Sequence, residues 1–97
     1  MENKIYLTNL FDIYGDLLTE KQIAYFKDYY FDDLSLSEMS ENYNVSRNAV
    51  HKQIKDVVSK INSYEEKLNL YNKKQKIYDI MTKVEDKELV KRIKELL

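Results

Sequence analysis

The chain has 97 residues, which is enough for one modest hydrophobic core and excludes a second enzyme-sized domain. It has no proline, one glycine and no cysteine, so the turn residues of most sheets are missing, and disulfides, thiolate zinc sites and cysteine nucleophiles are excluded. Hydrophobic residues make up 43% of the chain, which predicts a folded all-α domain, and the formal net charge of −1 means that phosphate binding would depend on local clusters of Lys and Arg.

The first two helices are predicted from hydrophobic periodicity and capping residues. Apolar side chains recur every three or four residues from Leu7 to Leu18, which indicates one amphipathic helix that ends near Gly15. Thr19 and Gln22 then match the capping-box pattern, so a second helix is expected to begin there. The aromatic residues of this second helix are interpreted as core material, because this half of the chain is acidic and a base-stacking platform would need basic neighbours.

A helix, a tight turn and a second helix are expected in the segment 36–61. Ser35 and Glu38 form another capping box, which would begin a short helix. Asn44 occupies the position at which a left-handed residue would end that helix, and Ser46 can cap the next helix at once. Such a unit is a helix-turn-helix, whose second helix enters the major groove in many DNA-binding proteins.

A long helix is predicted to follow the turn. Apolar residues spaced alternately by four and three continue over residues 50–78, like the seam of a coiled coil, and this stripe is expected to pack on the first helix or on a second copy of the chain. Ser63 and Glu66 form a third capping box, which favours a break or bend near Asn62. The residues expected to contact a partner or to form a dimer seam are Ile61, Tyr64, Leu68, Tyr71 and Tyr78.

The predicted fold is all-α: a small helical bundle that contains the helix-turn-helix and carries a long C-terminal helical extension. A last amphipathic helix is expected at residues 86–97. We divide the chain into a helix-turn-helix domain at residues 1–62 and an extension at residues 63–97, which packs on that domain or forms the dimer seam. The sequence contains no signal-peptide pattern and no run of 18 apolar residues, so a cytoplasmic protein without a membrane partner is expected.

Charge is distributed unevenly along the chain. Residues 1–45 contain three lysines and nine acidic residues, a net charge of −6, whereas residues 46–76 contain eight basic and three acidic residues, a net charge of +5. The basic segment begins at the second helix of the helix-turn-helix, where contacts with phosphates would be needed. The candidate nucleic-acid-binding residues are Ser46, Arg47, Asn48, His51, Lys52, Lys55 and Lys60.

The side chains at this helix start have the chemistry needed to read a major groove. Arg47 can bind guanine through two hydrogen bonds, and Asn48 can bind adenine in the same way. His51 can donate to a base edge or a phosphate, the lysines are expected to bind phosphates, and Ser46 lies where the backbone amides of a helix start can meet a phosphate. The alternative interpretation is an ordinary solvated helix face.

Most of the sequence is similar to a known bacterial family. The segment 34–54, LSLSEMSENYNVSRNAVHKQI, resembles the helix-turn-helix of sigma-factor region four. Together, residues 11–55 and 63–74 resemble YlxM-type proteins, which are small helical proteins typically encoded beside genes of the signal recognition particle. The resemblance implies a DNA-binding or regulatory role in that pathway, with residues 46–61 as the recognition helix, and it does not imply an enzyme.

The sequence is compatible with two functions of different classes. The first is a nucleic-acid-binding regulator, with DNA favoured over RNA as the partner. The second is a protein-binding adaptor that engages a component of the signal recognition particle through its acidic half. Catalysis and cofactors are not expected, because one His, one Gly and no Cys offer no nucleophile–base pair, metal cluster or phosphate loop. The acidic residues of the adaptor hypothesis are Glu2, Asp12, Asp16, Glu20, Asp28, Asp32 and Asp33.

Overall fold

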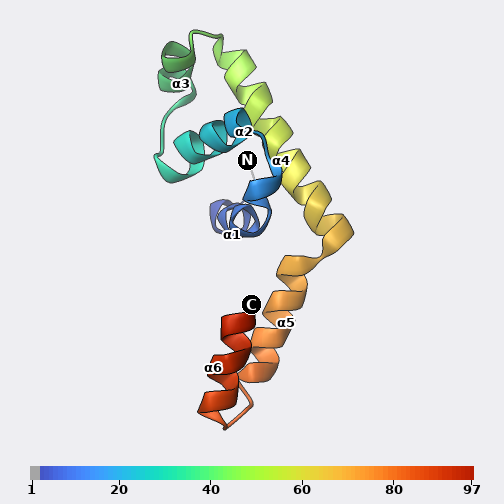
Figure 1. The fold of residues 1–97 in the computed structure, drawn as a ribbon. Coiled ribbons are helices and arrows are strands. Elements are labelled where there is room, and N and C mark those ends of the chain that lie inside the picture. Colours follow the sequence, from blue (N-terminus) through green and yellow to red (C-terminus); the bar gives the residue numbers. More distant parts are fainter. Residues whose placement is uncertain (1–2) are drawn as a thin grey trace.

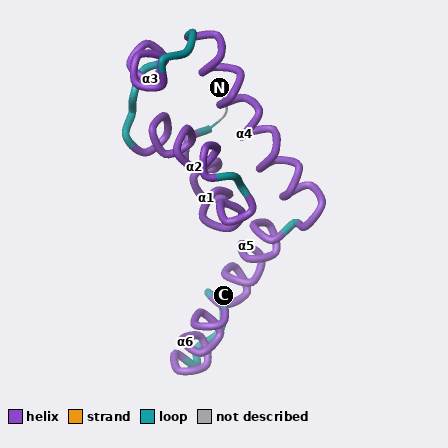
Figure 2. The backbone as a smooth tube through the Cα atoms, turned by 45° about the horizontal axis from the view of Figure 1, so that its top comes forward, coloured by secondary structure: helices purple, strands orange, loops and turns teal. Residues whose placement is uncertain are grey.

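The computed structural model describes residues 3–97, and within this range every regular element is helical. Helices α1, α2 and α3 gather around the first part of α4, and α5 and α6 form a hairpin beyond its far end (Figure 1; Figure 2). The molecule is elongated, measuring 54 × 25 × 22 Å. The all-α prediction is therefore confirmed.

The elements in chain order are α1 (Lys4–Tyr14), the 3-10 turn η1 (Gly15–Leu17), α2 (Glu20–Phe26), the π-helical turn η2 (Lys27–Phe31), α3 (Leu36–Tyr43), α4 (Arg47–Leu68), α5 (Leu70–Met81) and α6 (Lys87–Leu96).

The capping residues near the amino end behave as their sequence pattern predicts. The Thr19 hydroxyl accepts from the Gln22 amide at 3.2 Å, and the Gln22 side chain accepts from the Thr19 amide at 2.9 Å. The same reciprocal pair of hydrogen bonds links Ser35 and Glu38 at the start of α3. Each pair satisfies two backbone donors that a helix start leaves without partners, which fixes where α2 and α3 begin.

A single hydrophobic core lies among α1, α2, α3 and α4. Phe11 and Phe26 stack face to face with ring centroids 4.4 Å apart, and they join α1 to α2. Met39 of α3 is fully buried in the same cluster, as are Val50 and Ile61 of α4. The aromatic residues of the second predicted helix are largely core residues, as their sequence context indicated.

The predicted break near Asn62 is wrong. Helix α4 continues through Asn62 and Ser63 to Leu68, so Ser63 and Glu66 do not begin a new helix. The chain bends instead at Asn69, whose φ of 56° lies in the left-handed region. Asparagine tolerates this region better than other residues with a β-carbon, which suits it to a helix end.

A buried carboxylate holds this bend. Glu65 is only 8% exposed, and its side chain accepts hydrogen bonds from the amides of Tyr71 and Asn72 at 3.0 and 3.1 Å. These amides belong to the first turn of α5, where a negative charge also complements the helix dipole. The Tyr14 hydroxyl donates to Glu65 at 2.6 Å and accepts from the Leu70 amide at 3.2 Å, so one network joins α1, α4 and α5.

The expected seam does not form one exposed stripe. Ile61 is fully buried in the core of its own chain, and Tyr64 and Tyr71 pack against that core from its edge. Leu68 is 45% exposed, and Tyr78 lies on the hairpin. The sequence allowed the stripe to pack on the first helix or on a second copy of the chain. Up to Ile61 it packs in the core that includes the first helix. The division into domains at residues 1–62 and 63–97 stays a prediction, with α4 running across its boundary.

No helix among residues 3–97 combines the length and the apolar character needed to span a bilayer.

Candidate nucleic-acid interface

The turn between α3 and α4 has the geometry of a tight helix-turn-helix connection. Asn44 has a φ of 54° and a ψ of 47°, as predicted for the left-handed residue that ends α3. The Val45 amide donates to the Ser40 carbonyl at 3.1 Å, and the Asn44 amide donates to the Glu41 carbonyl at 3.3 Å. This pair of bonds is the Schellman motif, which satisfies the last carbonyls of a helix while the chain reverses.

The start of α4 is capped as predicted and exposes polar side chains. The Ser46 hydroxyl accepts from the Ala49 amide at 3.0 Å. Arg47, Asn48 and His51 are all exposed, and together with Ser46 and Leu36 of α3 they line a shallow hollow. The structure thus brings four of the seven candidate residues to one surface at the helix start.

The opposite face of the same helix explains why these side chains point outward. Val50 is fully buried and Ile54 and Val57 are 1% exposed, because α2 and α3 pack against this side of α4. Burying this apolar stripe fixes the rotation of the helix about its axis. The polar residues between the buried positions are consequently held toward solvent.

The three candidate lysines are in different environments. Lys52 forms an exposed ion pair with Asp56 at 3.3 Å, which is weak enough to leave the ammonium available to a phosphate. Lys55 is exposed and belongs to no ion pair among residues 3–97. Lys60 is half-buried and donates to the Gln22 side chain at 3.3 Å, on the side of α2. It lies about 20 Å along the helix axis from Arg47, so it is not part of the surface at the helix start.

An aromatic and acidic contact holds α3 against the preceding segment. The rings of Tyr25 and Tyr43 stack with centroids 4.3 Å apart, and the Tyr43 hydroxyl donates to the Asp28 carboxylate. Burial and this hydrogen bond raise the pKa of Tyr43 from 10.0 to about 12. Asp28 therefore has a structural role, and the sequence alone gave no sign of its pairing with a tyrosine 15 residues away.

The shifted pKa of Tyr43 predicts a loss of stability at high pH. The unfolded chain releases the Tyr43 proton near pH 10, whereas the folded chain retains it until about pH 12, so the free energy of unfolding falls across that interval. Phenylalanine has no hydroxyl to titrate, so in Tyr43→Phe the free energy of unfolding should fall over this interval by less than in the wild type, by a difference on the order of 2 kcal/mol. The measurement is urea unfolding of both chains from pH 9 to pH 12. Equal slopes for the two chains would contradict the prediction.

The acidic residues of the adaptor hypothesis do not share one environment. Asp28 is engaged by Tyr43, and Asp33 pairs with Lys4 at 2.9 Å on the surface. Asp12 and Asp16 are exposed on α1 and η1 and form no ion pair within the described part of the chain. Glu2 lies outside the described residues.

The arrangement offers binding rather than bond-making groups. Residues 3–97 contain no cluster of His, Cys, Asp or Glu that could hold a metal ion. The hollow at the helix start contains an arginine, an amide, an imidazole and a hydroxyl, all of which recognise polar partners through hydrogen bonds. The fold and this surface define a helix-turn-helix protein.

Comparison with known proteins identifies the family. The profile of the UPF0122 family, described as "Putative helix-turn-helix protein, YlxM / p13 like", matches residues 1–97. A UPF0122 protein of Malacoplasma penetrans is 42% identical over 86 residues, covering 89% of this chain and 80% of the relative. A Bacillus pumilus relative is 41% identical over 97 residues, which is 100% of this chain and 80% of that protein. One from Ureaplasma urealyticum is 43% identical over 91 residues, with coverages of 94% and 92%.

The chain therefore belongs to the UPF0122 family, and its resemblance to YlxM-type proteins is confirmed. The description of the family names a helix-turn-helix protein and no enzyme activity.

Proposed function

We propose that this protein is a regulator that binds double-stranded DNA through the amino end of α4. One observation carries the proposal: Arg47, Asn48 and His51 are exposed at the start of a helix whose opposite face is buried in the core. A recognition helix must meet both conditions, because it has to enter a groove without unpacking its own domain. In a helix-turn-helix, the first helix packs against the recognition helix through a tight turn, and α3 packs against α4 in this way.

Each group at this surface has a proposed role. Arg47 donates two hydrogen bonds to a guanine edge, and Asn48 exchanges two with an adenine. His51 contacts a base edge or a phosphate, and Lys52 and Lys55, which lie on the same face of α4, bind phosphates. The Ser46 hydroxyl caps the Ala49 amide, and the other backbone amides of the first turn donate to a phosphate. Lys60, about 20 Å along the helix from Arg47, is proposed as an outer phosphate contact.

DNA is favoured over RNA on geometric grounds. The major groove of B-form DNA is about 12 Å wide and admits an α-helix, whereas the major groove of A-form RNA is too narrow for one. The residues 1–45, with a net charge of −6, would be repelled by a polyanion and would keep the rest of the protein away from the duplex. Binding is therefore expected to occur in one orientation, with α4 facing the DNA. A cytoplasmic location is part of this proposal.

Binding to a pool of labelled genomic DNA fragments tests the proposal. We expect Arg47→Ala combined with Asn48→Ala to raise the dissociation constant at least about tenfold, because each two-bond contact with a base is worth roughly 1–3 kcal/mol. The control replaces two exposed basic residues of the C-terminal hairpin, Lys83→Ala with Arg92→Ala; it removes one more positive charge than the test pair and should still change binding little. Fluorescence anisotropy gives both constants. Equal losses for the two pairs would refute recognition by α4.

A second candidate function rests on the exposed acidic residues of the first helix. Asp12 and Asp16 belong to no ion pair among residues 3–97, and a basic protein surface would complement them. In this alternative the chain is an adaptor for a component of the signal recognition particle, the pathway that the YlxM resemblance implies. Cross-linking the purified protein in a cell lysate separates the alternatives: recovery of nucleic acid supports the regulator, and recovery of protein supports the adaptor.

A further inference from the structure

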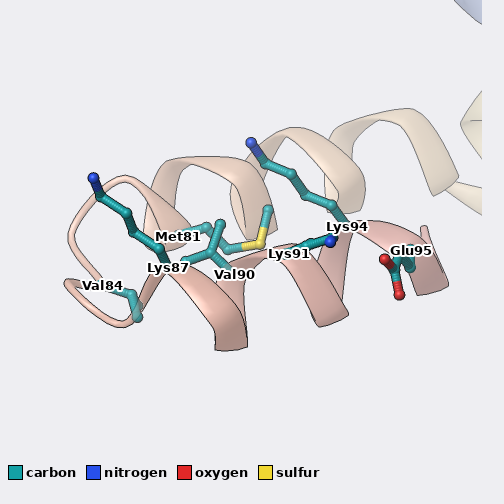
Figure 3. A pocket seen from close by; sticks show the side chains of 7 residues that line it. All are labelled: Met81, Val84, Lys87, Val90, Lys91, Lys94 and Glu95. Carbon is teal, nitrogen blue, oxygen red and sulfur yellow. The ribbon is translucent and has the colours of Figure 1, made fainter.

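Among residues 3–97, the hairpin of α5 and α6 contains an open groove. Figure 3 shows Met81 and Val90 between the two helices, with Lys87 and Lys94 extending past them to the same side. The hairpin also leaves large apolar side chains in solvent, above all Leu96, which is 87% exposed. We call this surface the hairpin groove: it has an apolar floor of Met81, Val84 and Val90 and a rim of Lys87, Lys91, Lys94 and Glu95, which is basic on balance.

The rim lysines form no ion pair within the described part of the chain. The ion pairs among residues 3–97 are Lys4 with Asp33 and Lys52 with Asp56, so none of the rim lysines is neutralised. The apolar floor is bordered by three lysines and one glutamate, a net positive charge, and therefore fits a helix that carries both an apolar side chain and carboxylates. It also selects against a basic partner, which would be repelled.

The first helix of the same protein has the complementary chemistry. Ile5 is 73% exposed, and Asp12 and Asp16 follow it at spacings of seven and four, which places the three on one side of α1 and its continuation η1. Both aspartates are exposed and belong to no ion pair of the described residues. We call these three residues the α1 acidic face.

Among the described residues, those that line the hairpin groove all lie between Met81 and Glu95, and none belongs to α1. The hairpin extends beyond the end of α4: α5 begins against α1, where the ring centroids of Tyr6 and Tyr71 lie 5.5 Å apart, and the turn between α5 and α6 lies at the end far from the bundle (Figure 1; Figure 2). The Glu65 network fixes the bend at which the hairpin leaves the bundle. A second molecule can supply the missing half of each contact.

We propose that the hairpin groove binds the α1 acidic face of a second copy of this chain. In the twofold-symmetric dimer that we propose, each copy contributes both surfaces, so two such contacts form and neither surface is left over. This arrangement differs from a coiled-coil seam, since Ile61, Tyr64 and Tyr71 stay packed in their own chain. The proposal does not depend on nucleic-acid binding.

Exchange of charges between the two surfaces provides the test. Lys91→Glu with Lys94→Glu makes the groove acidic, and Asp12→Lys with Asp16→Lys makes the helix face basic. All four positions are exposed, so both variants should fold, which circular dichroism verifies. By sedimentation velocity at up to about 100 μM, we expect the wild-type chain to dimerise and each variant alone to dimerise at least tenfold more weakly.

Mixing the two variants gives the decisive result. In the mixed pair both contacts join opposite charges, so an equimolar mixture should form a heterodimer although neither variant pairs with itself. A wild-type chain that stays monomeric overturns the proposal, as does a dimer that survives both charge reversals. Dissociation by Leu68→Glu with no effect of the charge reversals would also overturn it, because that outcome assigns the dimer to the seam.

Discussion

Replacing Glu65 with alanine is expected to lower the free energy of unfolding by roughly 3 kcal/mol, a large part of the stability of a domain of this size. The carboxylate is buried and accepts three hydrogen bonds, from the hydroxyl of Tyr14 and the amides of Tyr71 and Asn72. Alanine leaves these donors without their partner at the junction of three helices. Hydrogen bonds to a charged group are each worth about 1.5–3 kcal/mol, but water can reach the amides at the edge of the site, so we expect less than the sum.

The neighbouring residue provides a matched control. Glu66 has the same side chain on the same helix but is exposed, so Glu66→Ala should change stability by no more than about 0.5 kcal/mol. Urea unfolding followed by circular dichroism measures both variants. Glu65→Gln retains one acceptor and should fall between alanine and the wild type. If Glu65→Ala and Glu66→Ala cost the same, the network has no role in stability.

Tyr14 tests the same network from its other side. Burial and the hydrogen bond to Glu65 raise the pKa of Tyr14, which keeps its hydroxyl protonated as the donor that the carboxylate requires. If the two groups act as a unit, combining Tyr14→Phe with Glu65→Ala should cost less than the two separate losses added together. A loss of unfolding free energy in the double variant equal to the sum of the two single losses would show that the residues act independently.

The features that the sequence predicted well depend on neighbours along the chain. The two amino-terminal capping boxes, the left-handed Asn44 and the cap at Ser46 all involve residues within about four positions of one another. At this range the backbone itself determines which groups can meet, so residue type and spacing are sufficient. The exposed start of α4 follows in the same way from the apolar residues that alternate with its polar ones.

The break between α4 and α5 depends on residues that are far apart. The sequence around Ser63 and Glu66 has the capping pattern, but the helix passes through it because Ile61 is anchored in the core and Tyr64 packs at its edge. The actual bend at Asn69 is held by Glu65 and by Tyr14, which is 51 residues from Glu65. A local pattern cannot reveal such a contact, although an asparagine after a lysine-bearing last turn is a weak signal of a helix end.

The periodic stripe on α4 and α5 shows a different limit of sequence reasoning. Spacings of three and four state which face of a helix is apolar, but they do not state which surface covers that face. The structure answers this for Ile61, which its own core buries, and leaves Leu68 in solvent. For Lys60, likewise, a position in a basic segment gave no indication that Gln22 of α2 would be its partner.

Salt dependence offers the sharpest quantitative test of the proposed DNA interface. If about four phosphates are neutralised, the logarithm of the binding constant should fall with the logarithm of salt concentration at a slope of about −3.5. An increase from about 50 to 200 mM salt would then weaken binding roughly 100-fold. Lys52→Ala with Lys55→Ala removes two of the proposed phosphate contacts, so the slope should change to about −1.7.

A control variant at two other exposed lysines distinguishes specific phosphate contacts from an effect of overall charge. Lys73 and Lys76 lie on α5, away from the helix start, and Lys73→Ala with Lys76→Ala changes the net charge by the same amount as the test pair. If α4 binds the duplex, the control variant keeps a slope near −3.5. A diffuse attraction between protein and DNA instead predicts that the slope becomes shallower by the same amount in both variants. A binding constant that does not change with salt would exclude phosphate contacts altogether, because counterion release accompanies each of them.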